Sequence, residues 1–564
     1  CEFRINHMTV SKTTDANRTH GTIVLRGGRL TKWKGKAASL SPSLGQLIAS
    51  VSPVALGRAL MVGANRAATA AVLGGAGLIV TTSGVSADCT LGDPGVYTCS
   101  GAMGNGDGDL NTSPSTNLLD VTVSPSTTFN VTSGDAFELK SKAGITFTNN
   151  NSEVTITGAV DGIDVYNTVG AISITTTGDT KGTQHIGISA INANANGTSL
   201  TINAATTTGG QSGIRTFNNG TGALSITTTG TTTGTSSDGI RAINGGPDAP
   251  NRNNPIAATD LTINAATTTG GVYGIYARNF GTGALSITTT GATTGGTGGD
   301  GIWAYNSSAG ISLTINAATT TGGTSGISAD NKGTGALSIT TSGAITGGTY
   351  YGIAALTLAN KMTNITLNSG AVSSTAGLGI SNNGGNSNTT VNTGASVAGK
   401  IVLGDGVDSL NFAGGDFSGV TLFDGGAGTS DILKFSGSSG SVNSTLFSNW
   451  ETVEINDGST IAFSNSALTI NNLDINTDGT LNAVSGTFAM TGNLSNAGTV
   501  NMADGDTDDK VTVSGNFSGS ATGSGQIKID VDTKANTSDQ LAIAGNSSGT
   551  TKLAFTNLTP GKET

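Results

Sequence analysis

Residues that could carry out nucleophilic or acid–base chemistry are scarce in this chain. His185 is the only histidine after residue 20, so a Ser–His–Asp or Cys–His arrangement has almost nothing to draw on. Carboxylates remain, and three of them share one place just before a Gly-Ile pair: Asp161, Asp238 and Asp300. Acids on one outer face could cleave a polysaccharide, but Asp-Gly is also a favoured turn. We expect ordinary turns, no catalytic residue and no cofactor.

Metal binding has one weak signal. No pair of cysteines or histidines has the spacing of a metal site. Two acidic, glycine-rich turns, residues 404–408 and 424–431, are similar to the calcium-binding nonapeptide of β-rolls, although the first lacks a glycine and the second has an extra residue. The calcium candidates are therefore Asp405, Asp408, Asp424 and Asp431. Ordinary acidic turns are the interpretation that we favour.

A third group of side chains could recognise a ligand without reacting with it. Aromatic residues make up only 4% of the chain, yet they gather with arginines at two positions of a repeated phrase. Exposed aromatic and arginine side chains are favoured contacts for proteins and sugars. The alternative is that loops cover them or that the faces are reversed. The candidate binding face consists of Arg215, Phe217, Arg241, Tyr276, Arg278, Trp303 and Tyr305.

A repeat of about 26 residues positions these candidates, and it runs from about Ala143 to Ile380. A Gly-Ile pair opens each copy and a Leu-x-Ile phrase follows. Both phrases alternate apolar and polar residues, which is the pattern of a strand with one buried face. Such a unit cannot bury its own apolar face, so it must stack on its neighbours. The sequence predicts an all-β fold, a right-handed parallel β-helix with coils of about 26 residues.

Asparagine recurs four residues after the isoleucine of each copy. We expect these side chains to form a ladder at one bend, where each satisfies backbone groups of the next coil. The predicted ladder comprises Asn167, Asn192, Asn218, Asn244, Asn279, Asn306 and Asn331. One longer spacing holds a proline-containing insertion, Gly245 to Asp260, which we expect to be a loop.

The first 87 residues differ from the rest of the chain. They hold ten basic residues and two acidic ones, then a small-residue apolar run from Ala67 to Val80 and an Ala-x-Ala-like site ending at Ala87. This order predicts a long secretory signal over residues 1–87, because the run is too short to span a membrane. Residues 88–142 are expected to form a cap and the first coils. In an exported protein, Cys89 and Cys99 are expected to form a disulfide there.

The charge of the chain limits its partners. The net charge is −10, and the part that follows the basic first 87 residues is more acidic still. Nucleic acid is a poor partner for such a surface.

The pattern changes towards the end of the chain. Residues 381–471 are expected to form irregular coils. Residues 472–564 carry phrases such as Gly492-Asn-Leu-Ser-Asn-Ala-Gly498, Val511-Thr-Val513 and Ser538-Asp539-Gln540-Leu541. This segment resembles the carboxy-terminal end of passenger domains in pertactin-like bacterial autotransporters, the type V secretion family. In that family the segment forms the last coils and a cap that helps the passenger to fold.

The resemblance implies export through the inner membrane and a location at the cell surface, at the outer membrane or outside the cell. Family members continue into an outer-membrane β-barrel, which the sequence up to Thr564 lacks, so we expect a fragment or a truncated gene. We expect a non-catalytic scaffold, an adhesin with a part in virulence, that binds a host-cell or matrix protein or a glycan. The alternatives are self-association that aggregates cells, and a β-helix enzyme that acts on polysaccharides.

Overall fold

The computed structural model describes residues 10–15, 18–23, 88–100, 116–124, 129–246 and 258–559. The chain divides into two units, Cys1–Thr82 and Ser83–Thr564. In the first unit, β1 (Val10–Asp15) and β2 (Arg18–Ile23) form an antiparallel hairpin. The rest of the predicted signal segment and residues 247–257 of the insertion lie outside the described residues.

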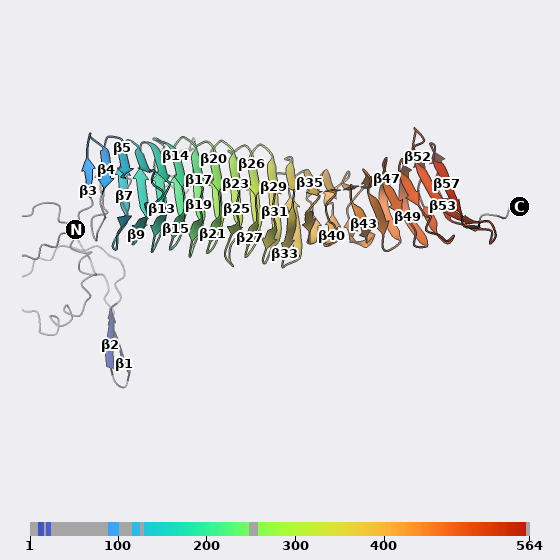
Figure 1. Ribbon diagram of the computed structural model, residues 1–564, viewed down its shortest axis with the longest axis horizontal. Helices are drawn as coiled ribbons and strands as arrows, with labels where there is room; N and C mark the ends of the chain where they lie inside the picture. Colours follow the sequence, from blue (N-terminus) through green and yellow to red (C-terminus); the bar gives the residue numbers. More distant parts are fainter. Residues whose placement is uncertain are drawn as a thin grey trace, which may run out of the picture. The chain divides into compact units, whose positions relative to one another are not determined.

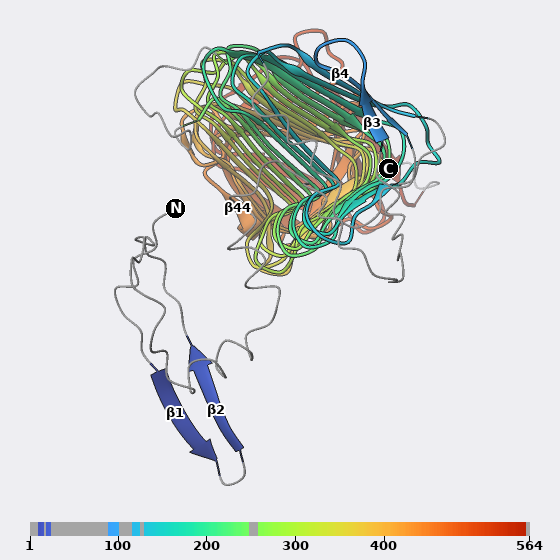
Figure 2. The same ribbon diagram turned by 90° about the vertical axis from the view of Figure 1, so that its left-hand side faces the viewer.

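The second unit is a parallel β-solenoid of about 17 turns, with about 25 residues in each coil. Its strands follow one another in sequence order from β3 to β57 (Figure 1). Viewed along the stack, the coils superimpose around a shared interior (Figure 2). Each strand pairs in parallel with the equivalent strand one coil away, so that Ile163 lies opposite Ile188 and Ile188 opposite Ile214. The predicted all-β fold of stacked, parallel coils is thereby confirmed.

Each regular coil contributes one strand to each of three sheets. The first sheet contains the Gly-Ile phrases and has 13 strands. Its strands are β7 (Phe137–Ser141), β10 (Ile163–Asn167), β13 (Ile188–Asn192), β16 (Ile214–Asn218), β19 (Ile240–Asn244), β22 (Ile275–Asn279), β25 (Ile302–Asn306), β28 (Ile327–Asn331), β31 (Tyr351–Thr357), β34 (Leu378–Asn383), β37 (Gly399–Val402), β40 (Val420–Asp424) and β44 (Phe447–Ser448).

The second sheet contains the Leu-x-Ile phrases, and the third sheet contains short Thr- and Gly-rich strands. In the regular region the second sheet is formed by β11 (Gly170–Thr176), β14 (Gly197–Ala204), β17 (Leu224–Thr228), β20 (Leu261–Ala265), β23 (Leu285–Thr289), β26 (Leu313–Ala317) and β29 (Leu337–Thr341). The corresponding strands of the third sheet are β12 (Thr180–Gly182), β15 (Thr207–Gly209), β18 (Thr232–Gly234), β21 (Thr268–Gly270), β24 (Thr293–Thr294), β27 (Thr320–Gly322) and β30 (Ile345–Gly347).

The core is a set of columns in which like residues stack on like. Ile214, Ile240 and Ile275 of the first sheet are fully buried, and so are Leu224 and Leu261 of the second. Alanines two residues after the isoleucines are also buried, as a narrow interior requires. Because each isoleucine contacts the coils on both sides, truncating one to alanine is expected to cost about 2–5 kcal/mol.

The predicted asparagine ladder lies at the bend after the first sheet. Its seven members are fully buried, and the Nδ2 of each of the first six donates a hydrogen bond to the Oδ1 of the next, over 2.9–3.2 Å. The same nitrogens also donate to backbone carbonyls of the bend, as Asn218 does to Gly222 at 3.0 Å. Asparagine fits this place because its side chain offers two donors and one acceptor to buried backbone that has no strand partner.

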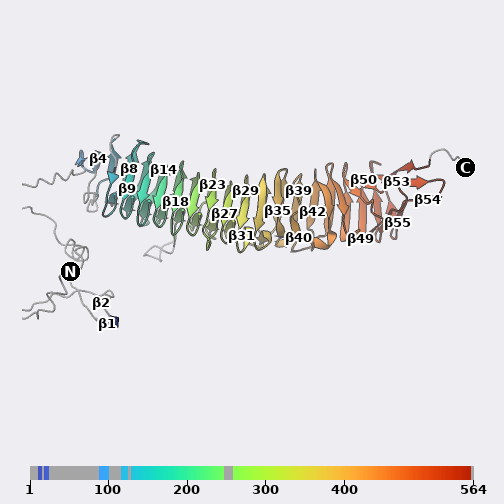
Figure 3. The same ribbon diagram turned by 60° about the horizontal axis from the view of Figure 1, so that its bottom comes forward.

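The last coils continue the same stacking (Figure 3). β47 (Ala467–Ile475), β49 (Thr487–Asn496) and β51 (Lys510–Val513) belong to the second sheet, and β55 (Gln540–Ile543) follows them. A separate sheet contains β43 (Ser439–Val442), β46 (Thr460–Phe463), β48 (Thr480–Asn482), β50 (Thr499–Asn501), β53 (Gln526–Asp532), β54 (Thr537–Ser538) and β57 (Lys552–Asn557).

Helical structure is minimal in the described residues. A single 3₁₀ turn, η1, spans Ser444–Leu446. Within the part of the chain that the structure describes, no helix has the length and apolar character needed to cross a membrane.

The start of the solenoid carries the predicted disulfide. Cys89 and Cys99 are joined across an antiparallel hairpin of β3 (Asp88–Leu91) and β4 (Val96–Ser100), where they are directly opposed. β4 then pairs in parallel with β5 (Leu119–Val123), so the cross-linked hairpin covers the first edge of the second sheet.

Candidate binding face

The candidate binding face lies on the outer surface of the first sheet, on adjacent strands β16, β19, β22 and β25. In β16, β22 and β25, outward side chains alternate with buried residues, and β19 follows the same pattern up to Ile243. The strand register sets Arg241 opposite Tyr276 and Tyr276 opposite Trp303. A second column, two residues further along the strands, sets Arg278 opposite Tyr305. The register thus brings the predicted side chains together across coils.

A continuous stack runs along the first of these columns. The guanidinium carbon of Arg241 lies 4.4 Å from the ring centroid of Tyr276. The rings of Tyr276 and Trp303 are 4.7 Å apart and 13° from parallel. A cation over an aromatic face contributes about 0.5–2 kcal/mol, depending on how far it is desolvated. The stack is therefore held by its own contacts before any ligand arrives.

The second column is ordered around Arg278. Its guanidinium lies 4.5 Å from the ring of Phe280 and 5.6 Å from that of Tyr305. The rings of Trp303 and Tyr305, two residues apart on β25, are 6.3 Å apart and 12° from parallel. Both rings are half-buried. Because the two rings are nearly parallel, their faces point in the same direction.

The aromatic stack ends at a small residue. Because Tyr276 covers one face of Trp303, the other face is directed to the next coil, where the opposed residue is Ser328. A serine side chain is too short to cover an indole ring. Tyr305 is opposed in the same way by Asp330, which forms an ion pair with Lys332 at 3.1 Å. The end of the stack thus combines two parallel rings with a short polar residue and a charged pair.

The other two members of the predicted face, on β16, relate differently to this stack. Arg215 is opposed to Arg241 in the same column, whereas Phe217 is separated from the second column. Arg215 and Phe217 contact each other at 5.1 Å, and Ile243 stands between Phe217 and Arg278 in the register. Ile243 is only 1% exposed although it occupies an outward position. The backbone at Gly246, in the insertion, lies against Ile243 and Phe280. At Ile243, the start of the insertion therefore covers part of the candidate binding face.

The structure adds two aromatic residues that the sequence pattern missed. The ring of Tyr273 lies 5.3 Å from Tyr276 and 6.4 Å from Trp303, and that of Phe280 lies 5.6 Å from Tyr305. Both residues flank β22 and are not part of the alternating phrase. A sequence signal existed for Tyr273, because it occupies the position before Gly-Ile that aspartate has in other coils.

The aspartates before the Gly-Ile pairs have a structural partner. The Oδ1 atoms of Asp161, Asp238 and Asp300 each accept the backbone N–H of the equivalent residue in the next coil, at 2.7, 3.4 and 2.8 Å. Burial raises the pKa of all three carboxyl groups. Arg241 Nη1 lies 3.3 Å from Asp238 Oδ2, and its charge offsets part of the increase in the pKa of Asp238. These acids join consecutive coils, as expected of turn residues. His185, at the turn before Gly187, is exposed.

Among the described residues, no three of the calcium candidates have carboxylate oxygens close enough to share an ion. Asp408 and Asp431 are buried one coil apart, and Asp431 Oδ1 accepts the backbone N–H of Asp408 at 2.8 Å. Asp424 accepts the backbone N–H of Gly426 and the Nδ2 of Asn449, and Asp405 is exposed. Among the described residues, the groups of three carboxylates close enough to share an ion lie elsewhere, at Asp135/Asp161/Asp164 and Asp504/Asp506/Asp509.

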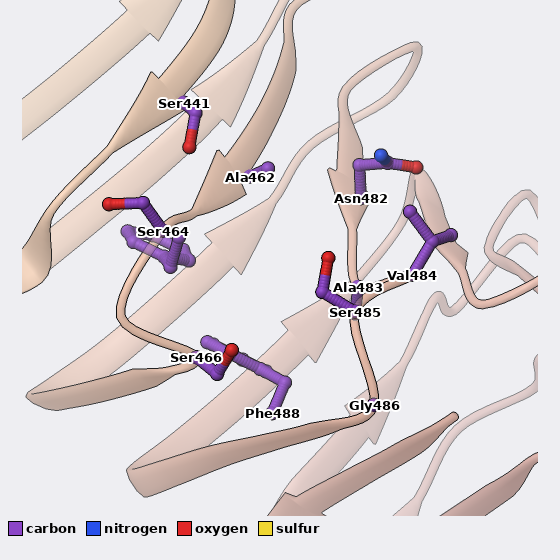
Figure 4. A pocket seen from close by; sticks show the side chains of 11 residues that line it. Ser441, Ala462, Ser464, Ser466, Asn482, Ala483, Val484, Ser485, Gly486 and Phe488 are labelled. Atoms are coloured by element: carbon purple, nitrogen blue, oxygen red, sulfur yellow. The ribbon is translucent and has the colours of Figure 1, made fainter. Parts of the chain in front are cut away.

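Two hollows also lie on the solenoid. One, of about 400 Å³, is on the first sheet beyond the aromatic stack, and its lining includes Asn382, Asn383, Asp405 and Asn449. The other, of about 70 Å³, lies among the last coils, and its lining combines four serines with small and apolar residues such as Ala462, Val484 and Phe488 (Figure 4). Only the first reaches the size of small-molecule sites, which is about 300–1,000 Å³.

The fold and this face define a parallel β-solenoid that presents an ordered aromatic and arginine surface. The architecture is compatible with a pertactin-like β-helix. No known protein family, curated protein or solved structure matches the chain.

Proposed function

We propose that this chain is an exported, surface-displayed passenger of the autotransporter type and that it binds a glycan on a host cell or matrix without catalysis. The observation that carries the proposal is the stack of Arg241, Tyr276 and Trp303, which ends beside Ser328. A pyranose ring has an apolar C–H face that packs on an aromatic ring, and its hydroxyls need donors and acceptors around the rim.

The end of the stack supplies both kinds of contact. Trp303 and Tyr305 offer parallel rings, and Asp330 and Lys332 offer charged hydrogen-bonding groups beside them. All four residues lie on or next to rigid, paired strands. Binding to a surface that is already ordered loses little conformational entropy, so a shallow site can still bind usefully.

The amide-lined hollow extends the surface along the same sheet. Asn382 and Asn383 belong to β34, which is three strands beyond β25 in the first sheet. Three inter-strand steps correspond to about 14 Å. An oligosaccharide could therefore contact both places, and several weak contacts along one rigid solenoid would add up through avidity.

Export is supported by sequence and by chemistry. The carboxy-terminal segment resembles that of pertactin-like passengers, and the basic first segment is typical of a secretory signal. A disulfide such as Cys89–Cys99 persists mainly outside the reducing cytosol. Exposure at the cell surface is where a glycan-binding scaffold would act as an adhesin.

A glycan array probed with the full chain tests this function. We expect selective binding that the double variant Trp303→Ala/Tyr305→Ala loses while its β-sheet circular dichroism is unchanged. Binding to no glycan, or equal binding by the variant, contradicts the proposal. Concentration-dependent assembly of the chain alone would instead support self-association.

Hydrolysis of a polysaccharide is a second candidate that one observation favours. Asp135, Asp161 and Asp164 each place a carboxylate oxygen within 4.8 Å of the others, and glycosidases use a pair of carboxyl groups to cleave a glycosidic bond. Burial, aided by the charges of Asp161 and Asp164, raises the pKa of Asp135 to about 6. Release of reducing sugars from a polysaccharide panel, abolished by Asp164→Asn, would establish this function in place of the first.

A further inference from the structure

The loop between β50 and β51 concentrates acidic residues among the last coils. It reads Asp504-Gly-Asp506-Thr-Asp508-Asp509. One carboxylate oxygen from each of Asp504, Asp506 and Asp509 lies within 4.8 Å of the other two. Asp504 and Asp506 are exposed, whereas Asp509 is 2% exposed. The loop is separate from the calcium candidates near residues 405–431.

Asp509 supplies an independent observation. Its Oδ1 accepts the backbone N–H of Gly486 at 2.6 Å. Its Oδ2 is buried and has no hydrogen-bond partner. A buried carboxylate oxygen without a partner destabilises the fold, because the hydration that it loses is not replaced. Asp509 thus combines a carboxylate oxygen without a partner with a place within 4.8 Å of the carboxylate oxygens of Asp504 and Asp506.

Two further aspartates hold the loop in place. Asp530 Oδ2 accepts the backbone N–H groups of Asp504 and Gly505 at 2.8 and 2.6 Å. Asp539 accepts those of Asp509 and Asp530 at 3.2 and 2.7 Å. Consecutive coils are thereby connected through carboxylates, and these add to the negative charge around Asp509.

Within the described part of the chain, no basic side chain forms an ion pair with this group of carboxylates. None of the ion pairs formed among the described residues involves an aspartate of the loop, or Asp530 or Asp539. Several carboxylates gathered without a basic partner repel one another, and a small cation removes that repulsion.

We propose that this loop binds a divalent cation, Ca²⁺, through the carboxylates of Asp504, Asp506 and Asp509. Calcium takes six to eight oxygen ligands in flexible geometry, and carboxylates of a surface loop, completed by water or backbone carbonyls, suit it better than the strict octahedron of Mg²⁺. Because Asp509 also binds Gly486 of the preceding coil, the cation stabilises the packing of the last coils.

Calcium binding to the full chain tests the proposal directly. Equilibrium dialysis with CaCl₂ measures the number of ions bound, and the variant Asp504→Asn/Asp506→Asn is expected to bind one ion fewer than the unmodified chain. Asp506→Asn alone is expected to weaken that site at least tenfold. Both positions are exposed, so circular dichroism is expected to stay unchanged.

The control is Asp478→Asn, at an exposed turn residue with a φ of +66°, a conformation that asparagine also adopts readily. It is expected to keep the full number of ions. Calcium is also expected to protect residues 486–543 from hydrogen exchange, more than MgCl₂ does at equal concentration. An equal number of ions in the double variant, or no binding at 1 mM CaCl₂, overturns the proposal.

Discussion

Trp303 stacks on Tyr276 at a ring separation of 4.7 Å, which matches the spacing of neighbouring strands in a sheet. The strand ladder itself therefore fixes the stack, because the two residues are directly opposed in register. Arg241 extends it by one more strand at 4.4 Å. A solenoid can thus build an aromatic surface by repeating one outward position, without a pocket.

Replacing Trp303 by alanine is expected to weaken glycan binding about tenfold or more. Truncation of a central aromatic contact commonly costs more than about 1.4 kcal/mol, the equivalent of a factor of ten. Isothermal titration with a glycan selected from the array measures the change. The matched control is Tyr350→Ala, which removes an aromatic ring that is 58% exposed at a turn away from the stack. An equal loss in both variants would show that the effect is not specific to the stack.

Replacing Ser328 by tryptophan is expected to block binding without unfolding the protein. An indole at this position would lie over the free face of Trp303 and continue the stack by one strand. The half-buried, outward position leaves room for it, so stability is expected to stay equal or to rise slightly. Thermal unfolding and glycan titration separate the two effects.

A bulky substitution on another sheet is the control for that experiment. Ser338 is an equally half-buried, outward serine on β29 of the second sheet. Ser338→Trp is expected to bind glycan as the unmodified chain does. Undiminished binding by Ser328→Trp would mean that the end of the stack is not the contact surface.

Replacing Asn244 by alanine is expected to destabilise the solenoid by about 2–4 kcal/mol, since buried donors and acceptors lose their partners. Its Nδ2 donates to the carbonyls of Thr259 and Asp260, which follow the insertion, and to Asn279 Oδ1. Hydrogen exchange is expected to accelerate first in β19, β20 and β22. Asn388→Ala, at an exposed position of β35 (Ser387–Asn392), is the control and is expected to change little. Equal exchange in both variants would contradict a structural role for the ladder.

Much of the architecture could be predicted because a solenoid repeats one register. The isoleucine column and the asparagine ladder follow from spacing alone, since equivalent residues of stacked coils are opposed. The same spacing predicts that Tyr276 and Trp303 lie in one column. Contacts that follow the ladder are therefore readable from a single sequence.

Contacts that depend on turns and irregular coils could not be read in this way. The burial of Ile243 depends on how the insertion begins at Gly245 and Gly246. The convergence of Asp509 with Asp530 and Asp539 joins coils of unequal length beyond the regular repeat, where spacing no longer gives the register. Tyr273 lies in a turn, where no alternation marks a residue as outward.

Replacing Asp431 by asparagine is expected to stabilise the protein at neutral pH and to lose that advantage in acid. Burial, with the nearby charges of Asp408 and Glu451, raises the pKa of Asp431 from 3.8 to about 6. The folded chain thus holds this proton more tightly than the unfolded chain. The contribution of Asp431 to stability is greatest below pH 3.8 and falls as the pH rises to about 6.

An asparagine keeps the acceptor for the backbone N–H of Asp408 but carries no charge at any pH. The variant is therefore expected to gain up to about 3 kcal/mol over the unmodified chain at pH 7.5, the free energy that corresponds to this difference in pKa, and nothing at pH 3.5. Urea midpoints between these values measure the change. Asp416→Asn is the control of opposite sign, because the N–H of Ser418 lowers the pKa of Asp416. The Asp416→Asn variant is expected to lose a little stability at neutral pH and none in acid. If the two variants instead show parallel pH profiles, the ionised carboxylate of Asp431 does not destabilise the folded chain.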